Sequence, residues 1–158
     1  MKHILAMVVL LTALSGCSEQ VALEDLQDRA EYLLCGRYEA GRESIQAMLT
    51  SDIDLWQSAL RRQLALEQTM VREFGDSSLW PPDVRRSALE YASALEQNIP
   101  TIVLMKEHVD NALTAGEALE AMTQDGRFEF ADSEVRASLE TELRVALGLP
   151  LESASSCG

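Results

Sequence analysis

The stretch Ile53–Phe74, IDLWQSALRRQLALEQTMVREF, decides the fold class of this chain. The residues of one side recur along it at steps of three and four, which is the period of an amphipathic α-helix. The residues of that stripe are Ile53, Trp56, Leu60, Gln63, Leu64, Glu67, Met70, Val71 and Phe74. Thr50-Ser51-Asp52 supplies N-cap chemistry before the stretch, and Gly75 ends it. We therefore predict one helix over residues 53–74.

The preceding residues carry the same period, with one weak region. Apolar residues recur at three- and four-residue steps from Val21 through Leu34, opposite a face rich in Asp and Glu, and the pattern resumes at Ile45, Met48 and Leu49. Gly36 and Gly41 lie between the two parts, and each lowers helix stability by about 1 kcal/mol relative to Ala. We therefore predict a helix that starts near residue 21 and kinks between residues 35 and 41.

Three further helices are predicted after the proline-containing turn at residues 76–83. They span about 83–99, 102–122 and 132–147. Pro100 would begin or kink the second of these, because proline fits the first turn of a helix better than its interior. Phe128 and Phe130 are predicted to pack inward from an extended connector. Five helices with short connectors predict an all-α bundle that forms a single domain over residues 21–158.

The amino terminus has the layout of a secretory signal, with Lys2 followed by a charge-free apolar run over residues 4–14. As a helix, this run would rise about 16 Å at ~1.5 Å per residue, which is roughly half of a ~30 Å hydrocarbon layer. It is therefore too short to span a membrane. The residues at its end, Leu14-Ser15-Gly16-Cys17, resemble the lipobox of bacterial lipoproteins. The resemblance implies diacylglycerol on the Cys17 thiol, cleavage after Gly16 and acylation of the new amino terminus.

This resemblance predicts a cleaved signal peptide over residues 1–16 and a lipidated tether over residues 17–20. Each buried methylene of the acyl chains contributes about 0.8 kcal/mol, so two or three chains would hold the protein on a membrane permanently. Lipoproteins with Asp directly after the lipidated Cys are retained in the inner membrane. Ser18 occupies that position here, which predicts the outer membrane, facing the periplasm. The alternative is an ordinary secreted protein whose Cys17 pairs with another Cys.

The composition is acidic, with 26 Asp and Glu against 13 Lys and Arg. Removal of residues 1–16 takes away Lys2 alone among these, which leaves a net charge of −14. Such a surface repels phosphate backbones, so we do not expect nucleic acid as a partner. After Lys2 the only lysine is Lys106, against eleven arginines, and Arg makes bidentate contacts with carboxylates. We therefore expect arginines to pair with surplus acids along helix faces.

The chain has three cysteines, and lipidation of Cys17 would leave Cys35 and Cys157 in a compartment that oxidises thiols. We predict a disulfide between these two, which staples the carboxyl-terminal tail to the first helix. It would close a loop of about 120 residues, worth on the order of 4 to 5 kcal/mol in the chain-entropy model. The alternatives are two free thiols or a metal pair. Neither a C-x-x-C motif nor a nearby His supports the metal pair.

No catalytic or metal-binding residue is assigned. His108 is the single His of the expected mature chain, and neither a nucleophile motif nor H-E-x-x-H is present. We therefore predict a protein that is not an enzyme and has no cofactor beyond the covalent lipid. Two alternatives are a carboxylate pair for glycoside hydrolysis and haem ligation by His108 with Met70, Met105 or Met122. Methionines at helical spacing are typical of a core, and aromatic residues for a sugar cleft are few.

The remaining candidates are binding surfaces. Leu79 and Trp80 lie in the turn before two prolines, and Trp is common at interface hot spots. The alternative for Trp80 is a lid folded under its own loop. Grooves between helices accept an amphipathic partner helix, and we expect an acidic rim to select a basic one.

The lipobox, the all-helical architecture and the cysteine pattern together resemble the pilotins that escort outer-membrane secretins in bacterial secretion systems. Those pilotins bind a terminal helix of the secretin subunit in a groove. The resemblance implies an outer-membrane lipoprotein with a periplasmic protein-binding domain, acting as an assembly or escort factor for an envelope complex. The alternative is an acidic inhibitor or exclusion-type lipoprotein that blocks a basic cell-wall enzyme, which the charge of −14 would suit.

Overall fold

The chain folds into helices joined by short connectors. The computed structural model describes residues 2–127, 133–151 and 157, and for residues 2–22 it describes the backbone alone. The helices are α1 (Lys2–Thr50), α2 (Ile53–Gly75), α3 (Pro82–Asn111), α4 (Ala115–Gln124) and α5 (Ser133–Leu147). No strand occurs within these described ranges. The predicted all-α bundle of five helices is confirmed.

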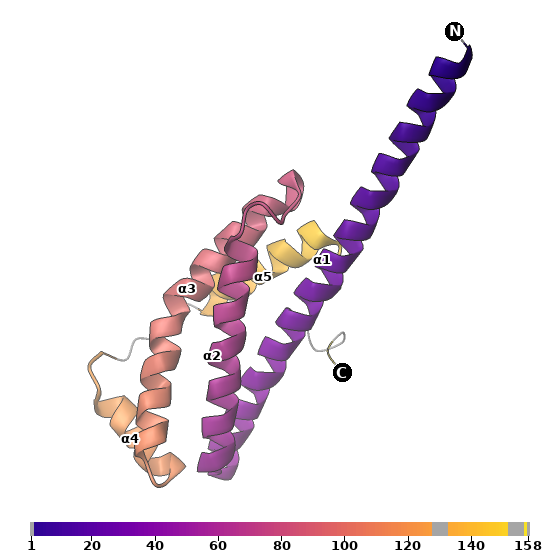
Figure 1. The fold of residues 1–158 in the computed structure, drawn as a ribbon. Coiled ribbons are helices and arrows are strands. Elements are labelled where there is room, and N and C mark those ends of the chain that lie inside the picture. The colour runs from indigo at the N-terminus through magenta and orange to yellow at the C-terminus, as the bar shows by residue number, and fades with distance from the viewer. Residues whose placement is uncertain (1, 128–132, 152–156, 158) are drawn as a thin grey trace.

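Helices α1, α2 and α3 are consecutive antiparallel neighbours with α2 in the middle, and they form a three-helix layer (Figure 1). Helix α5 packs on α3 and crosses toward α1 at one end of this layer, whereas α4 packs on α3 at the other end. The first part of α1 projects well beyond the bundle. The two short helices therefore cover different ends of one layer.

The core consists of two clusters, one beneath each short helix. The α5 cluster contains Ala30, Leu33, Leu34, Met70, Phe74, Trp80, Val84, Ala88, Tyr91, Ala92, Leu95, Leu143 and Leu147. The α4 cluster contains Ala47, Trp56, Leu60, Ile102, Val109, Ala115, Ala118 and Met122. Helix α2 contributes to both clusters through the predicted stripe, because Trp56, Leu60, Met70 and Phe74 are all 0% exposed. That stripe holds the two ends of the bundle together.

Helix α1 differs from the sequence prediction in two respects. It begins at Lys2 rather than near residue 21, so residues 17–20 are helical in the full chain. It also runs unbroken through Gly36 and Gly41, so the predicted kink is wrong. A Cβ at Gly36 would lie 3.3 Å from Leu66 Cδ2, which shows how closely α2 packs there. Packing of this kind outweighs the ~1 kcal/mol that each glycine takes from helix stability.

Of the two possibilities predicted for Pro100, the start of a new helix is wrong. Pro100 is inside α3, which continues to Asn111, and the chain breaks at residues 112–114. Thr114 caps α4 by accepting a hydrogen bond from the Glu117 amide at 3.2 Å, and Glu117 accepts one from the Leu113 amide at 2.8 Å. This Thr-x-x-Glu pattern is a variant of the capping box, in which Glu117 bonds the residue before the cap, and it is visible in the sequence.

The capped break changes which residues of this region are buried. The sequence pattern placed Leu113 and Leu119 on one apolar stripe with Met105 and Met122. In the structure Leu113 is 84% exposed and Leu119 is 43% exposed. Ala115 and Ala118 take the buried positions instead, because the break rotates α4 relative to α3.

The end of α5 and the disulfide return the tail to α1. Gly148 adopts a left-handed conformation with φ +68°, and the amides of Gly148 and Leu149 donate to the carbonyls of Val145 and Arg144. These bonds form a helix end that favours glycine. The predicted disulfide between Cys35 and Cys157 is present, with a Cα–Cα distance of 5.1 Å. The predicted connector residues Phe128 and Phe130 lie outside the described residues.

Candidate binding groove

A buried carboxylate lies at the centre of the bundle. Glu67 of α2 is 0% exposed. It accepts hydrogen bonds from Arg37 Nε at 3.0 Å, Asn98 Nδ2 at 2.9 Å and Gln63 Nε2 at 3.3 Å. A buried charge is tolerated when it is paired and its oxygens accept hydrogen bonds. Glu67 therefore ties α1, α2 and α3 together at this level.

Helix α5 joins the same network through Glu140. This carboxylate accepts hydrogen bonds from Arg144 Nε at 3.0 Å and the Tyr91 hydroxyl at 3.2 Å, and it lies 3.5 Å from Arg37 Nη1. Burial opposes the charge of Arg37, but Tyr91, Glu67 and Glu140 raise its pKa above the ordinary value. Burial raises the pKa of the Tyr91 hydroxyl well above its usual range, so this hydroxyl remains a neutral donor. Arg37 thus bridges two carboxylates and fastens α5 to the layer.

An open hollow lies on α1 and α2 directly beside this network. It has a volume of about 340 Å³. Its lining residues are Arg37, Tyr38, Gly41, Arg42, Ile45 and Gln63; we call it the α1 groove. Gly41 leaves room in its wall, because a Cβ at that position would meet no atom within 4 Å. The volume falls within the ~300–1,000 Å³ range typical of ligand pockets.

The α1 groove continues into an exposed apolar stripe on the same helix. Ile45 is 56% exposed, Leu49 is 81% exposed and Tyr38 is 37% exposed. Ile45 and Leu49 were expected on the buried side, but Ser44 and Ala47 occupy it. Large apolar side chains exposed at helical spacing are typical of surfaces that bind a partner. The signal available in the sequence was a second apolar stripe at positions 38, 45 and 49.

The charge of the α1 groove differs from that of the whole chain. The chain has a formal net charge of −13, yet the lining contains two arginines and no carboxylate. Arg37 is engaged by Glu67 and Glu140. Arg42 is exposed, and no ion pair to it occurs within the described ranges. The expectation of an acidic rim is therefore wrong for this groove.

Trp80 and Leu79, the two turn residues selected from the sequence, differ in exposure. Trp80 is 3% exposed, donates from Nε1 to the Glu73 carbonyl at 3.0 Å and packs against Phe74 with ring centroids 5.4 Å apart. It is a lid on the α5 cluster, as the alternative for Trp80 predicts, so its ring is not an exposed anchor. Leu79 is 46% exposed, but it lies apart from the groove at the other end of α2.

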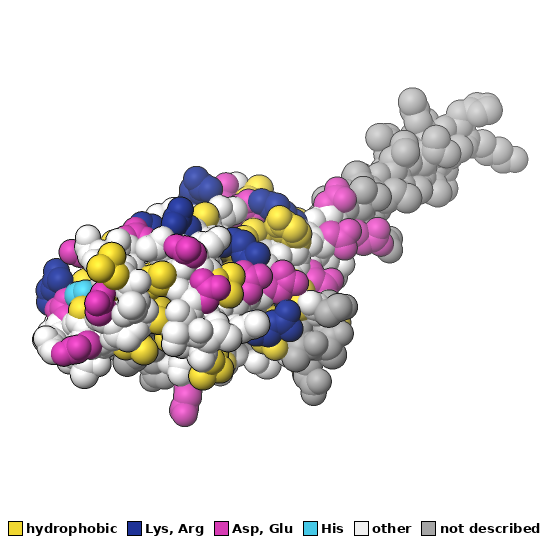
Figure 2. All heavy atoms as spheres, turned by 90° about the horizontal axis from the view of Figure 1, so that it is seen from below, with side chains coloured by type: hydrophobic (Ala, Val, Ile, Leu, Met, Phe, Trp, Pro, Cys, Tyr) yellow, Lys and Arg dark blue, Asp and Glu magenta, His cyan; other side chains and the backbone are white. Residues whose placement is uncertain are grey.

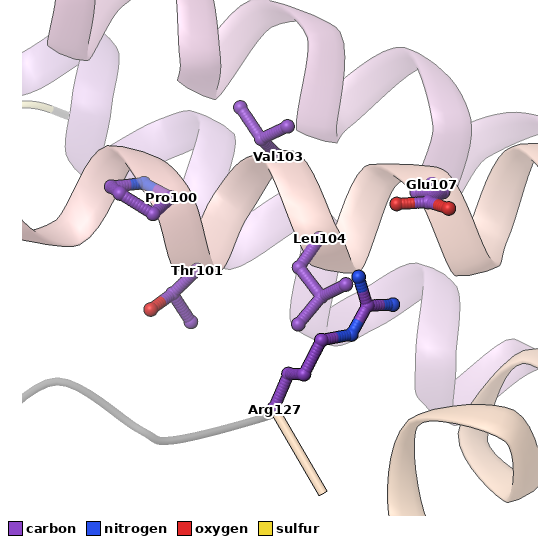
Figure 3. Close-up of a pocket in the computed structure, with 6 residues that line it drawn as sticks. All are labelled: Pro100, Thr101, Val103, Leu104, Glu107 and Arg127. Atoms are coloured by element: carbon purple, nitrogen blue, oxygen red, sulfur yellow. The ribbon is translucent and has the colours of Figure 1, made fainter. Parts of the chain in front are cut away.

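A second hollow, of about 440 Å³, lies along α3 beside Arg127 (Figure 3). Pro100, Thr101, Val103, Leu104 and Glu107 form its α3 wall. The Arg127 guanidinium donates to both oxygens of Asp125 at 3.0 and 2.7 Å, so it is already engaged. We therefore regard this hollow as a weaker candidate than the α1 groove.

His108 has a structural position between α3 and the end of α4. Its Nε2 lies 2.8 Å from Asp125 Oδ2, which links α3 to the end of α4. Hydrogen bonds from Arg127, and then from His108, lower the pKa of Asp125 well below its usual range. Of the methionines in the haem alternative, Met70 belongs to the α5 cluster, and Met105 and Met122 belong to the α4 cluster.

Comparisons with known proteins add no relative. No protein-family model, curated protein or solved structure matches this chain. Cys17 of the lipobox lies in the part of α1 for which the backbone alone is described. Among the residues whose side chains the structure describes, no helix combines the length and apolar character needed to cross a bilayer, and no group of three or more His, Cys, Asp or Glu could hold a metal ion.

Proposed function

We propose that this protein is an outer-membrane lipoprotein whose periplasmic helical domain binds a segment of another envelope protein in the α1 groove. The observation that carries the proposal is the open apolar surface of Tyr38, Ile45 and Leu49 beside Gly41. An amphipathic helix laid into such a groove would bury this surface. The lipobox that ends at Cys17 supports the lipid anchor, and Ser18 directly after it supports the outer membrane.

The proposed role is that of an assembly or escort factor rather than an enzyme. A lipid anchor on Cys17 would fix the domain at the membrane surface, and the residues of α1 between Cys17 and the bundle would separate the groove from that surface (Figure 1). A segment of a nascent envelope protein, once bound, would be delivered to the same membrane. The resemblance to pilotins supports this role, because their groove carries a terminal helix of a secretin subunit.

Photo-crosslinking in cells that express the full chain tests the proposal. The photoreactive residue p-benzoylphenylalanine replaces Tyr38, Ile45 or Leu49 in separate variants, and Leu113 serves as the control because it is 84% exposed beside α4. We expect the three groove positions to crosslink to one envelope protein and the control to give no such product. Crosslinking from all positions alike, or from none of the three, would contradict the proposal.

The anchor is tested separately. We expect Cys17→Ser to move the protein from the membrane fraction to the periplasmic fraction, because the acyl chains would be lost. Mass spectrometry of the wild-type chain should show a lipid-modified Cys17 at the amino terminus. An unmodified thiol there, or membrane association that survives the substitution, would remove the anchor from the proposal.

A second candidate is the acidic inhibitor. Acidic side chains gather at the root of the projecting part of α1 (Figure 2), where Glu24, Asp25 and Asp28 are exposed. This surface would attract a basic cell-wall enzyme. Neutralising the three residues to Gln and Asn would then weaken inhibition of a basic muramidase, whereas crosslinking in the α1 groove would be unaffected.

A further inference from the structure

We infer that the α1 groove selects a partner segment that carries a carboxylate beside its apolar side chains, with Arg42 as the specificity-determining residue. The inference rests on the proposed function and adds the chemistry of the partner. It also reverses the expectation that an acidic protein selects a basic segment here.

The two arginines of the groove differ in what they already bind. Arg37 is 19% exposed at its side chain and lies within 3.5 Å of both Glu67 and Glu140. Arg42 lies at the open rim, and within the part of the chain that the structure describes it has no carboxylate within ion-pair distance. The neighbouring Arg62 differs again, because its Nη2 pairs with Glu43 at 3.0 Å. Arg42 is therefore the groove arginine whose charge is available to a partner.

The chemistry of the guanidinium determines what Arg42 would bind. Arginine has five N–H donors in a planar fork that matches a carboxylate and cannot act as an acceptor. Tyr38 and Ile45 flank it one turn before and about one turn after, so a partner with a carboxylate between two apolar residues would satisfy all three. Elsewhere the excess of 26 acidic over 13 basic residues repels such a segment. The groove would thus accept a carboxylate despite the acidic character of the chain.

A matched pair of small probes tests the carboxylate preference on the folded domain. The probes are 4-phenylbutyrate and its neutral analogue 4-phenylbutanamide, titrated at millimolar concentration against ¹⁵N-labelled protein. We expect both to shift the amide resonances of Tyr38, Gly41 and Ile45, with the carboxylate binding about threefold to fivefold more tightly, as for a partly exposed ion pair.

Two variants and one control assign the preference to Arg42. Arg42→Gln should make the two probes bind equally, and Arg42→Lys should retain part of the preference because the positive charge stays. Arg62→Gln is the control, and it should leave the preference unchanged because Arg62 is paired with Glu43 outside the groove. All three variants keep the buried network intact, so we expect wild-type spectra away from the substitution.

The outcomes separate this inference from the proposed function. Equal binding of the two probes to the wild type, a preference that survives Arg42→Gln, or no binding of either probe would each overturn the carboxylate inference. Crosslinking from Tyr38, Ile45 and Leu49 to one envelope protein would in each case still support the groove as a binding site. Loss of crosslinking with a retained carboxylate preference would instead overturn the proposed function alone.

Discussion

The end of the three-helix layer beneath α5 and the α1 groove differ in one respect: a helix of the chain covers the first, and no helix of the described residues covers the second. At one end α5 supplies a second layer, and Arg37, Glu67 and Glu140 pair beneath it. A turn and a half further along α1, Arg42 and Ile45 face an open hollow. Where the chain provides its own covering helix, the carboxylates of Glu67 and Glu140 are paired with Arg37 and the cluster of apolar side chains beneath α5 is buried. Where it does not, both an apolar stripe and an arginine remain for a partner.

Among the changes that test this contrast, removal of Arg37 should lower the free energy of unfolding most. Arg37→Met would leave the buried carboxylate of Glu67 without its cation, and we expect the free energy of unfolding to fall by about 4 kcal/mol. The matched change Arg42→Met should alter it by less than about 0.5 kcal/mol, because Arg42 is exposed. Urea denaturation at neutral pH measures both. Equal losses for the two variants would mean that Arg37 contributes no more than a surface arginine.

Removing the disulfide should have the next largest effect. The double change Cys35→Ser and Cys157→Ser opens a loop with a sequence separation of 122, and we expect a loss of about 3 kcal/mol. This is below the chain-entropy value because α5 remains attached through Glu140 and Leu143. Reductant should destabilise the wild-type chain to the same extent and leave the double variant unchanged. A double variant as stable as the oxidised wild type would show that the staple adds nothing.

A pair of leucines on α1 sharpens the contrast between covered and open surface. Leu33 is 1% exposed and Leu49 is 81% exposed. Leu33→Ala should lower the free energy of unfolding by about 2 to 3 kcal/mol through lost burial and a cavity, whereas Leu49→Ala should change it by less than about 0.5 kcal/mol. Thermal unfolding compares the two variants. A large loss with Leu49→Ala would indicate that this residue is covered in the folded protein, which would contradict the open stripe.

The smallest effect concerns Asp125 at the α4 end. Its pKa is lowered in the folded protein by Arg127 and His108, so the unfolded state binds the proton first. The stabilisation by this carboxylate is therefore complete above its ordinary pKa of about 3.9 and is lost as the pH falls below that value. Urea denaturation should show wild type more stable than Asp125→Asn at neutral pH, with the difference shrinking toward about pH 2. A difference that stays constant over this range would contradict the role of the charge.

Secondary structure was predictable where periodicity alone decides it. The stripe from Trp56 to Phe74 is buried as expected, because a 3.6-residue pattern leaves one way to bury an amphipathic helix. The positions at which helices end were less predictable. Gly36 and Pro100 weaken a helix locally, but packing against α2 keeps both helices continuous. The true break before α4 had a local signal in Thr114 and Glu117, since a capping box satisfies backbone groups without help from the rest of the fold.

The groove was not predictable, since its existence depends on where α4 and α5 lie. The pattern from residue 45 to 49 read as core, yet Ile45 and Leu49 are exposed and Ser44 is buried. The sequence left Trp80 open between an interface residue and a lid, and only the contacts decide for the lid: its ring packs against Phe74 and its Nε1 donates to the Glu73 carbonyl. Each of these outcomes depends on contacts between segments distant in the chain, which local spacing does not encode.

The sequence by itself determined the helical class, the central stripe of α2 and the pairing of Cys35 with Cys157. Apolar periodicity is a property of the chain that needs no neighbours to be read, and the cysteine pairing was predicted by setting Cys17 aside for the proposed lipid. The tertiary structure alone decided that Glu67 is paired and buried while Arg42 faces an open groove. The reason is physical, because the cost of a charge or an exposed apolar side chain depends on what packs against it, and that is settled only when α4 and α5 cover the two ends of the layer.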